Sequence, residues 1–490
     1  MSAHLTSSAP PPQILRRYDD LPGPRRLPVV GNLLQIKPPR LHLQLEDWAR
    51  QYGPVYRLQL GPKQAVVFGD HQLVQAMLRD RPDGFRRSSR LLQISMEMGL
   101  PSGVFNATGD TWKRQRRMVM HGFDPAHVRR YFPSLQGVAQ RLVGRWRKAA
   151  GAGQLIDLQA DLMRYTVDTI AGLAFGAEVN TLESDHDRIQ QHLDKIFPAI
   201  SRRVLAPLPI WRWWTSAADR ELAASLVEVK AAIDGFISQA RARLDADPER
   251  RSQPHNLLEA MITAADQPDS GIDDAQVAGN VLTMLLAGED TTANTIAWMI
   301  HLLWQNPQAL ARASEEVRRV CAGLTGGEAP TLAMIEQLDY VEACAHETMR
   351  LKPVAPILPQ EALRDTALGD VQIEKGMIVF GLMRRDAVSE DQVPRAVEFD
   401  PERWLGQGAV SQTASSAKRV SMPFGAGPRI CPGRYLALLE MKMAMAVLLL
   451  HFDLQSVDTS DGEPPVELLS FTMTPVGLGM RLRKRDRDRS

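Results

Sequence analysis

The sequence predicts a mainly helical α+β fold, a single helix-rich domain with small β-sheets. Helical periodicity dominates from Arg129 to Arg319, while short segments of alternating apolar and polar residues gather towards the two ends. The chain has 490 residues, 44% of them hydrophobic, which is enough for a large core. No linker divides it. We therefore predict one domain over residues 21–483, between a disordered tail at 1–20 and a charged tail at 484–490.

The clearest predicted element is a long helix from Asp274 to Asn306. Asp273 is suited to cap its N-terminus, and the pair Asn306-Pro307 is suited to end it. At 1.5 Å per residue the helix would be about 50 Å long. Apolar residues occupy most of its faces, so we expect it to be buried. Contact with solvent therefore does not explain the polar residues in the middle of this helix.

Alternating segments and turn residues predict three hairpins around this helical region. A short helix is also expected from Asp70 to Arg79. The expected hairpins are Val55–Leu60 with Gln64–Phe68, the two halves of Val371–Leu382, and strands around Leu468–Met473 and Leu478–Leu482.

The composition argues against several classes of protein. The formal net charge is +1, from 58 basic and 57 acidic residues, so no basic surplus indicates nucleic-acid binding. Three cysteines are too few, and odd in number, for a disulfide framework, which fits a reducing compartment. No segment approaches the roughly 20 apolar residues that cross a bilayer, and the N-terminus lacks the layout of a signal peptide. We expect a monomeric, cytoplasmic protein without a membrane span.

The strongest motif is FGAGPRICPG, from Phe424 to Gly433. Its glycines allow backbone angles that other residues avoid, and let a flat ligand approach closely. Arg429 can direct a guanidinium at an anion. A buried helix is predicted after Gly433, and its N-terminal end beside Cys431 favours a thiolate. An isolated cysteine is usually a buried structural residue, but the fixed spacing of Phe, Gly, Arg, Cys and Gly favours a chemical role.

This motif resembles the haem-binding loop of the cytochrome P450 superfamily, in its soluble, bacterial-type form. The resemblance covers roughly Leu21 to Arg483 and implies the P450 fold, a catalytic domain over 21–483, and haem b. It implies that Cys431 is the axial thiolate, that Phe424 packs near its sulfur, and that Arg429 reaches a haem propionate. Gly433 belongs to the same cofactor-binding loop. A thiolate ligand donates electron density to the iron and favours O–O cleavage.

The resemblance also implies a second propionate-binding element. Trp112 and Arg116 lie one helical turn apart, either in a solvated basic helix or, as in the family, against a propionate. Many relatives carry a further propionate arginine ten residues after the arginine of a Glu-x-x-Arg pair, where this chain has Gln360. We expect propionate binding to rely on Trp112, Arg116 and Arg429.

The segment AGEDTT, from Ala287 to Thr292, interrupts the long apolar helix. Gly288 lacks a side chain and Thr291 can bond to a carbonyl one turn earlier, so the helix can bend here. One interpretation is an ordinary polar turn. By resemblance to the distal motif of the family, Asp290 and Thr291 are instead the catalytic acid and alcohol that deliver protons during oxygen activation. Glu289 is expected to have no role in proton delivery.

Glu347 and Arg350 lie three residues apart in HETMRLKP. Such a pair is commonly a solvated surface bridge that contributes little. By resemblance, the pair and Arg403, in the later segment Pro401–Trp404, form a buried triad behind the cysteine loop that supports folding. Loss of one member of a buried triad would leave a charge unpaired.

Four residues are expected to line a substrate pocket. Phe105 lies seven residues before Trp112, Ala287 lies on the long helix, and Val354 and Ala355 follow the Glu-x-x-Arg helix. Taken alone, Phe105 could equally be an ordinary residue of the hydrophobic core. Together the four predict an apolar chamber for a lipophilic small molecule, with fatty acids, terpenoids, steroids and aromatic compounds all open.

The resemblance predicts a monooxygenase that inserts one oxygen atom from O2 into this substrate by hydroxylation or epoxidation. The chain ends soon after its last predicted hairpin, which favours a separate electron donor such as ferredoxin or flavodoxin with its reductase. The basic residues expected to dock this donor are Lys113, Arg114, Arg117, Lys418, Arg419 and Arg434.

Three alternatives stand beside this function. A peroxide-driven or rearranging haem-thiolate enzyme would have little need of the Asp290-Thr291 pair. A non-catalytic haem-binding protein would need no proton delivery. A cysteine-nucleophile enzyme would need a base near Cys431, and His451 lies twenty residues away, after a buried helix.

Overall fold

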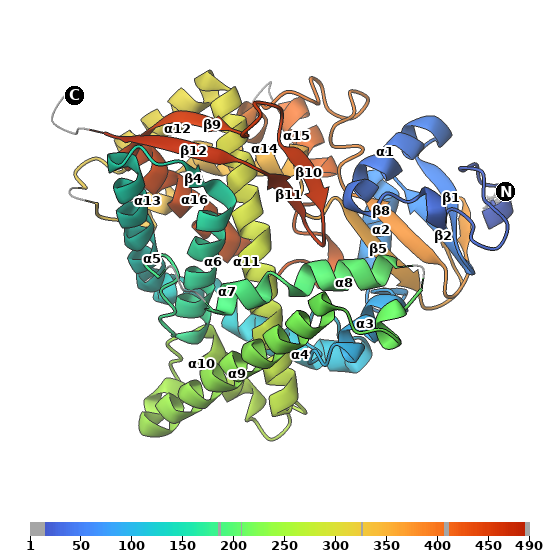
Figure 1. Cartoon of the computed structure of the whole chain (residues 1–490), viewed down its shortest axis with the longest axis horizontal. Coiled ribbons are helices and arrows are strands. Elements are labelled where there is room, and N and C mark those ends of the chain that lie inside the picture. Colours follow the sequence, from blue (N-terminus) through green and yellow to red (C-terminus); the bar gives the residue numbers. More distant parts are fainter. Residues whose placement is uncertain (1–14, 185–187, 207, 325–326, 406–410, 486–490) are drawn as a thin grey trace, which may run out of the picture.

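The protein is built from a large helical body and a smaller β-rich region beside it (Figure 1). The computed structural model describes residues 15–184, 188–206, 208–324, 327–405 and 411–485. The α-helices are α1 Leu41–Tyr52, α2 His71–Arg79, α3 Ser89–Glu97, α4 Gly109–Gly122, α5 Pro125–Gly151, α6 Leu158–Phe175, α7 Arg188–Leu193, α8 Ile196–Leu205, α9 Ala217–Ala246, α10 Leu257–Ala265, α11 Asp274–Gln305, α12 Pro307–Val320, α13 Leu332–Glu336, α14 Asp339–Leu351, α15 Ser411–Val420 and α16 Arg434–His451.

The strands are short, and most belong to two sheets. They are β1 Val55–Leu60, β2 Lys63–Phe68, β3 Phe85–Arg86, β4 Ile156–Asp157, β5 Ile357–Ala362, β6 Thr366–Leu368, β7 Val371–Ile373, β8 Ile378–Leu382, β9 Phe452–Asp458, β10 Val466–Leu469, β11 Met473–Val476 and β12 Gly479–Lys484. The predicted mainly helical α+β fold is confirmed.

The long helix α11 runs through the centre of the helical body (Figure 1). The Asp273 carboxylate accepts a hydrogen bond from the Gln276 backbone N–H at 2.8 Å, and the Gln276 side chain accepts one from the Asp273 N–H. The helix ends at Gln305, because α12 begins at Pro307. Its apolar side chains belong to the main core, with those of α5, α6 and α16. The predicted long buried helix is confirmed.

The largest sheet has the strand order β1-β2-β8-β5-β3. The predicted hairpin of β1 and β2 is confirmed, with Val55 opposite Phe68 and Leu60 opposite Lys63. β8 lies parallel to β2 and antiparallel to β5. The predicted helix at residues 70–79 is also confirmed, since the Asp70 carboxylate caps α2.

The other two predicted hairpins are wrong in their pairing. β7 pairs with β6, and β8 enters the large sheet instead of folding back on β7. Near the C-terminus β11 pairs with β10, whereas β12 pairs with β9 and β4. These strands pair with strands that are more distant in sequence because that pairing buries their side chains. The alternation of apolar and polar residues does not show which strand will be the partner.

Part of the predicted N-terminal tail is ordered. The Arg16 backbone N–H donates to the Asp370 carbonyl at 2.7 Å, and its guanidinium binds the Asp370 carboxylate. Tyr18 is buried, and its hydroxyl donates to the Leu58 carbonyl at 2.7 Å. The prediction of disorder is therefore wrong for residues 15–20, because Tyr18 has an apolar site beside β1. Residues 1–14 lie outside the described residues.

The C-terminal end of the described chain is also paired. Lys484 closes β12 opposite Phe452, and the Arg485 guanidinium binds the Asp453 carboxylate. The predicted charged tail therefore starts as an ordered strand end, and residues 486–490 lie outside the described residues. Throughout the described part of the chain, no helix combines the length and apolarity needed to cross a membrane.

Candidate active site

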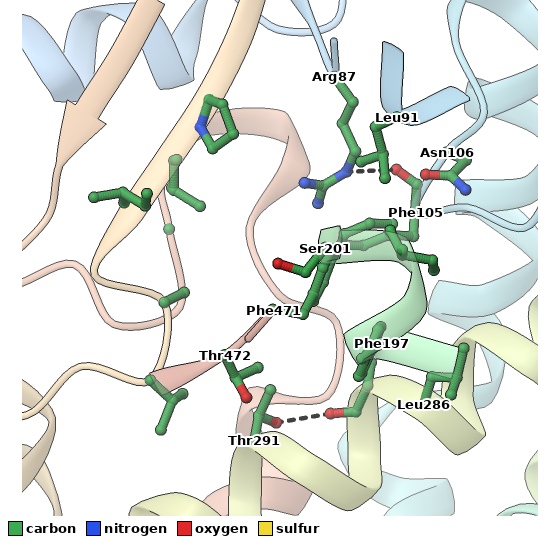
Figure 2. Close-up of a pocket in the computed structure, with 18 of the residues that line it drawn as sticks. Arg87, Leu91, Phe105, Asn106, Phe197, Ser201, Leu286, Thr291, Phe471 and Thr472 are labelled. Atoms are coloured by element: carbon green, nitrogen blue, oxygen red, sulfur yellow. Dashed lines mark hydrogen bonds between the residues drawn. The ribbon is translucent and has the colours of Figure 1, made fainter. Parts of the chain in front are cut away.

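A cavity of about 1140 Å³ lies between the middle of α11, the cysteine loop, α4, α8 and the large sheet (Figure 2). Eleven of the residues predicted from the sequence line it. They are Phe105, Trp112, Arg116, Ala287, Thr291, Val354, Ala355, Phe424, Arg429, Cys431 and Gly433. Segments from most of the chain meet here, so the tertiary structure brings together the predicted cofactor and substrate residues.

Cys431 lines this cavity just before the N-terminus of α16. Its backbone N–H donates to the Phe424 carbonyl at 2.9 Å. Burial raises the pKa of the Cys431 thiol, while a hydrogen bond from the Gly433 backbone and the charges of Arg116 and Arg434 lower it. Burial is the largest of these effects, and a metal ion bound to this sulfur would favour the thiolate.

The glycines of the cysteine loop have different roles. Gly425 and Gly427 have φ angles of 75° and 70°, in the left-handed region predicted for them. A Cβ atom on Gly427 would lie 2.6 Å from the Leu78 carbonyl oxygen, so a larger residue does not fit. Gly433 has φ of −83°, which any residue adopts, so the prediction of an unusual backbone is wrong there. Gly433 instead lines the cavity and donates to Cys431.

Three guanidinium groups, those of Arg81, Arg87 and Arg429, gather on one side of the cavity. The Arg429 guanidinium lies 4.8 Å from the centre of the Trp112 ring. Arg87 Nε donates to the Phe105 carbonyl at 2.8 Å, and its guanidinium lies over the Phe105 ring (Figure 2). Arg81 and Arg87 were not predicted as site residues, because basic residues between two short elements are ordinary in a loop.

The pKa values of these three guanidinium groups are all lowered. Burial, together with repulsion from a neighbouring guanidinium, lowers the pKa of Arg81 and of Arg429 to about 10, and lowers that of Arg87 well below its usual value. The buried Nε of Arg429 has no hydrogen-bond partner within the described residues. Among those same residues, none of the three guanidiniums has a carboxylate within ion-pair distance. An anion is the group that this side of the cavity lacks.

Arg116 and Gln360 were also considered for the predicted propionate site. Arg116 donates to the Ile430 carbonyl at 2.7 Å and so ties α4 to the cysteine loop. Gln360 is fully buried in β5, its amide nitrogen donates to the Pro359 carbonyl at 2.7 Å, and it does not line the cavity. The cations on this wall come instead from residues 81–87, earlier in the chain.

Asp290 and Thr291 are neighbours on α11, but their side chains make separate hydrogen bonds. The Thr291 hydroxyl donates to the Ala287 carbonyl at 2.7 Å. The Asp290 carboxylate accepts from the Asn294 amide at 2.8 Å and from the Thr472 hydroxyl. Burial raises the pKa of Asp290, against the opposite effect of these two hydrogen bonds. Thr472 lines the cavity with Thr291 and so connects Asp290 to it (Figure 2).

Glu347, Arg350 and Arg403 form a fully buried cluster. The Arg350 guanidinium donates to both Glu347 carboxylate oxygens, at 2.8 and 2.7 Å, and Arg403 Nε donates to the same carboxylate at 3.2 Å. Trp404 Nε1 adds a further hydrogen bond to Glu347 at 2.8 Å. The other N–H groups of the Arg350 and Arg403 guanidiniums donate to backbone carbonyls of residues 387–398. The pair is therefore not a solvated surface bridge.

Aromatic side chains line another part of the cavity. The rings of Phe197, from α8, and Phe471 are stacked at 4.4 Å with an interplanar angle of 3°. The ring of Phe105 lies 5.9 Å from that of Phe471 (Figure 2). Cavity residues that the sequence analysis missed are Arg81, Arg87, Leu91, Phe197, Ser201, Leu286, Glu440, Phe471 and Thr472.

The cytochrome P450 family model matches residues 21–481. The chain belongs to the cytochrome P450 family. This P450 is 28% identical over 442 residues to a carotene epsilon-monooxygenase, chloroplastic, of Arabidopsis thaliana, with 85% of this chain and 77% of the relative covered. The solved haem domain of cytochrome P450DA superimposes with a TM-score of 0.80, at 25% identity, over 96% of this chain and 99% of that one.

A self-sufficient cytochrome P450 monooxygenase of Aspergillus niger is 30% identical over 459 residues. The match covers 91% of this P450 but only 41% of the length of that relative. Family and fold together show that the protein is a P450 monooxygenase and imply a haem with thiolate ligation. The cavity fits that group, because it presents one cysteine sulfur and a set of buried guanidiniums that lack an anion.

Proposed function

We propose that this P450 hydroxylates or epoxidises an elongated lipophilic small molecule, with O2 as the oxidant and electrons from a separate donor protein. The observation that carries the proposal is the single cavity in which Cys431, the guanidinium cluster and an aromatic wall meet. The cavity extends from Thr291 to Leu34 near the surface, which suits a long apolar substrate. The name of the carotene-oxidising relative supports a substrate of this kind.

The haem, when bound, would supply the oxidising chemistry through its thiolate-ligated iron. Cys431 would hold the iron, with Phe424 and Gly433 beside it in the same loop. Trp112, Arg116 and Arg429 would hold the propionates, as the resemblance implies. Arg81 and Arg87 would join them, because carboxylates placed among the clustered guanidiniums would offset their mutual repulsion.

Asp290 is proposed to hold a proton and to exchange it with the cavity through Thr472. Burial raises the pKa of Asp290, and the Thr472 hydroxyl already donates a hydrogen bond to its carboxylate. The Thr291 hydroxyl would orient hydrogen bonds on the side of the cavity that Thr291 and Thr472 line. Phe105, Ala287, Val354 and Ala355 would contact the substrate, with Phe197 and Phe471 opposite Phe105.

The arrangement favours this function over the alternatives. A peroxide-driven enzyme has little use for the contact between Asp290 and Thr472. His451 ends α16, so about 27 Å of helix separates it from the loop that holds Cys431, too far for a base to a nucleophile. Cys344 is buried and forms no disulfide within the described residues, which supports a place in the cytoplasm.

The experiment that tests this proposal is a carbon monoxide difference spectrum of the reduced, haem-loaded protein. We expect the strongly red-shifted Soret band of thiolate-bound haem, and we expect Cys431→Ala to abolish it. Cys321→Ala is the matched control, because Cys321 is buried at the end of α12, away from the cavity. A Cys431→Ala protein that retained the band would contradict the assignment.

A further inference from the structure

Two buried amide side chains, Asn280 on α11 and Gln115 on α4, lie behind the loop that carries Phe105. Both residues are fully buried. Asn280 Nδ2 donates to Gln115 Oε1 at 3.1 Å and to the Gln276 carbonyl at 2.7 Å. A buried amide is costly unless its hydrogen-bonding groups have partners, so the partners of this pair show what the pair holds in place.

The other groups of both amides bind the backbone of residues 98–108, between α3 and α4, which we call the Phe105 loop. Asn280 Oδ1 accepts from the Val104 N–H at 2.9 Å. Gln115 Nε2 donates to the Ser102 carbonyl at 3.1 Å. The loop is therefore attached to two helices, at the residues on either side of Gly103.

At Gly103 the Phe105 loop approaches α11 more closely than a side chain would allow. A Cβ atom on Gly103 would collide with the Gly279 carbonyl oxygen and with the Thr283 hydroxyl. A Cβ atom on Gly279 would lie 2.6 Å from the Ser102 carbonyl carbon. Backbone packs directly on backbone here, and the hydrogen bond to Asn280 fixes which turn of α11 the loop meets.

Asn280 lies on the face of α11 that also carries Ala287 and Thr291. These residues are seven and eleven positions further along, which correspond to two and three turns of an α-helix. All three line the cavity. At 1.5 Å per residue, Thr291 lies about 16 Å from Asn280 along the helix. The attachment at Asn280 therefore sets the position of the Phe105 loop relative to Thr291.

The rest of the Phe105 loop is held by guanidinium groups. Arg87 Nε donates to the Phe105 carbonyl at 2.8 Å (Figure 2), and the Arg429 guanidinium donates to the Ala107 carbonyl at 2.5 Å. In the proposed function these two arginines also hold haem propionates. Asn280 and Gln115 thus provide the attachment of the loop that does not depend on the cofactor.

We propose that Asn280 and Gln115 are positioning residues that determine the shape selectivity of the apolar chamber by fixing the place of the Phe105 ring. They act through the backbone of the Phe105 loop, at Val104 and Ser102, and not through contact with the substrate. The inference rests on the proposed function in one respect, which is that Phe105 contacts the bound molecule.

Optical titration of the ferric, haem-loaded protein with 4-phenylimidazole and with imidazole tests this proposal. The two probes share the imidazole that ligates haem iron and differ by one apolar ring. The ratio of their dissociation constants therefore reports on the chamber and not on the haem. Asn280→Leu with Gln115→Met replaces both partners by apolar groups of similar volume, which largely preserves stability. We expect 4-phenylimidazole to bind about tenfold more weakly relative to imidazole, because the Phe105 ring loses its fixed place.

A double-mutant cycle shows whether the two amides act through Phe105. Phe105→Ala alone should weaken the binding of 4-phenylimidazole relative to imidazole. In the Phe105→Ala background, the change at Asn280 and Gln115 should alter the ratio less than about twofold, because no ring remains to be positioned. Effects that multiply fully would instead show that the amides act independently of Phe105, and would overturn the proposal.

Gly103→Ala provides a second route to the same displacement. Its Cβ pushes the Phe105 loop away from Gly279 while both amides remain, so the ratio should shift in the same direction. This variant also tests the proposal if the double amide variant fails to hold haem, which melting and haem content reveal. Gln276→Ala is the matched control, because this amide of α11 accepts from the Asp273 N–H and does not line the cavity. Its ratio should equal that of the unmodified protein.

An unchanged ratio in Gly103→Ala and in the double amide variant would overturn the proposal. None of the titrations requires O2, an electron donor or turnover. A failure of the proposed reaction would leave them unaffected, so the two failures are distinguishable.

Discussion

Arg81, Arg87 and Arg429 place three cations on one side of the cavity, although all three are distant in sequence from Gln360, the position that the Glu-x-x-Arg spacing suggests. Each is costly to bury, and burial with a like-charged neighbour lowers the pKa of each. Gln360, where many relatives carry an arginine, is neutral and turned to its own strand. We propose that Arg81 and Arg87, from a different segment, replace the charge missing at Gln360, which a comparison position by position overlooks.

Arg87→Ala should have opposite effects on the haem-loaded and haem-free protein. We expect haem transfer to apomyoglobin to become faster, on the order of tenfold, because a charge-assisted hydrogen bond to a propionate is lost. The haem-free protein should instead melt at a higher temperature, since repulsion in the cluster is relieved. Arg86→Ala is the control, because Arg86 pairs with Glu361 at 2.8 Å and does not line the cavity. Equal transfer rates for the two variants would place the propionates elsewhere.

Thr291 and Thr472 should differ in their effects on turnover. Thr291→Ala should retain haem and bind substrate but lose more reducing equivalents as hydrogen peroxide. Thr472→Val should slow turnover by about 10- to 100-fold, as should Asp290→Asn, because Asp290 loses its contact with the cavity. Product, peroxide and NADPH consumption measured together distinguish these outcomes. Thr474→Val, at a buried position on β11, should behave normally; unchanged turnover in Thr472→Val would move the proton path to another group.

Helices position the site by their ends and by the loops that follow them. α14 carries Glu347 and Arg350, and the Arg350 guanidinium organises residues 387–398 by donating to their backbone carbonyls. Arg403 reaches the same carboxylate from the segment Pro401–Trp404. This cluster joins three stretches of loop that have little core of their own, so its stability depends on every charge having a partner.

Glu347→Ala should leave two buried guanidiniums without a carboxylate. We expect a loss of about 3–5 kcal/mol in the free energy of unfolding, and little haem-loaded protein after purification. Circular dichroism melting and the ratio of haem to protein measure both effects. Arg395→Ala is a suitable control, because its side chain is 60% exposed and pairs with Glu398 and Asp400 at the surface. A Glu347→Ala protein with normal melting and normal haem content would show that the cluster is dispensable.

The whole molecule presents an exposed basic face around the cysteine loop. Arg116 ties α4 to this loop, so the exposed residues Lys113 and Arg117 of α4 lie near it, and Arg434 follows directly after it. Lys418 and Arg419, at the end of α15, are exposed as well. The net charge is only +1, and we propose that these residues form a local basic face that docks an acidic electron donor.

Reduction by an acidic ferredoxin should therefore slow steeply as ionic strength rises. Lys113→Glu with Arg117→Glu should slow it by a further factor of about ten or more, without a change in substrate binding, because long-range attraction to the donor is lost. Stopped-flow reduction under carbon monoxide provides the rate. Arg220→Glu with Lys230→Glu on α9 makes the same change of charge away from the loop and should have no effect. A rate that does not depend on salt would place the docking site on another face.

Features that depend on residues a few positions apart could be predicted from the amino-acid sequence. These are the cap and end of α11, the hairpin of β1 and β2, and the loop around Cys431, because caps, turns and tight loops are set by local backbone chemistry. Three features could not be predicted in this way: the pairing of β7, β8, β11 and β12, the cation cluster, and the contact of Thr472 with Asp290. Each of these joins residues that are distant in sequence, and their proximity follows from how the whole core packs rather than from any local pattern.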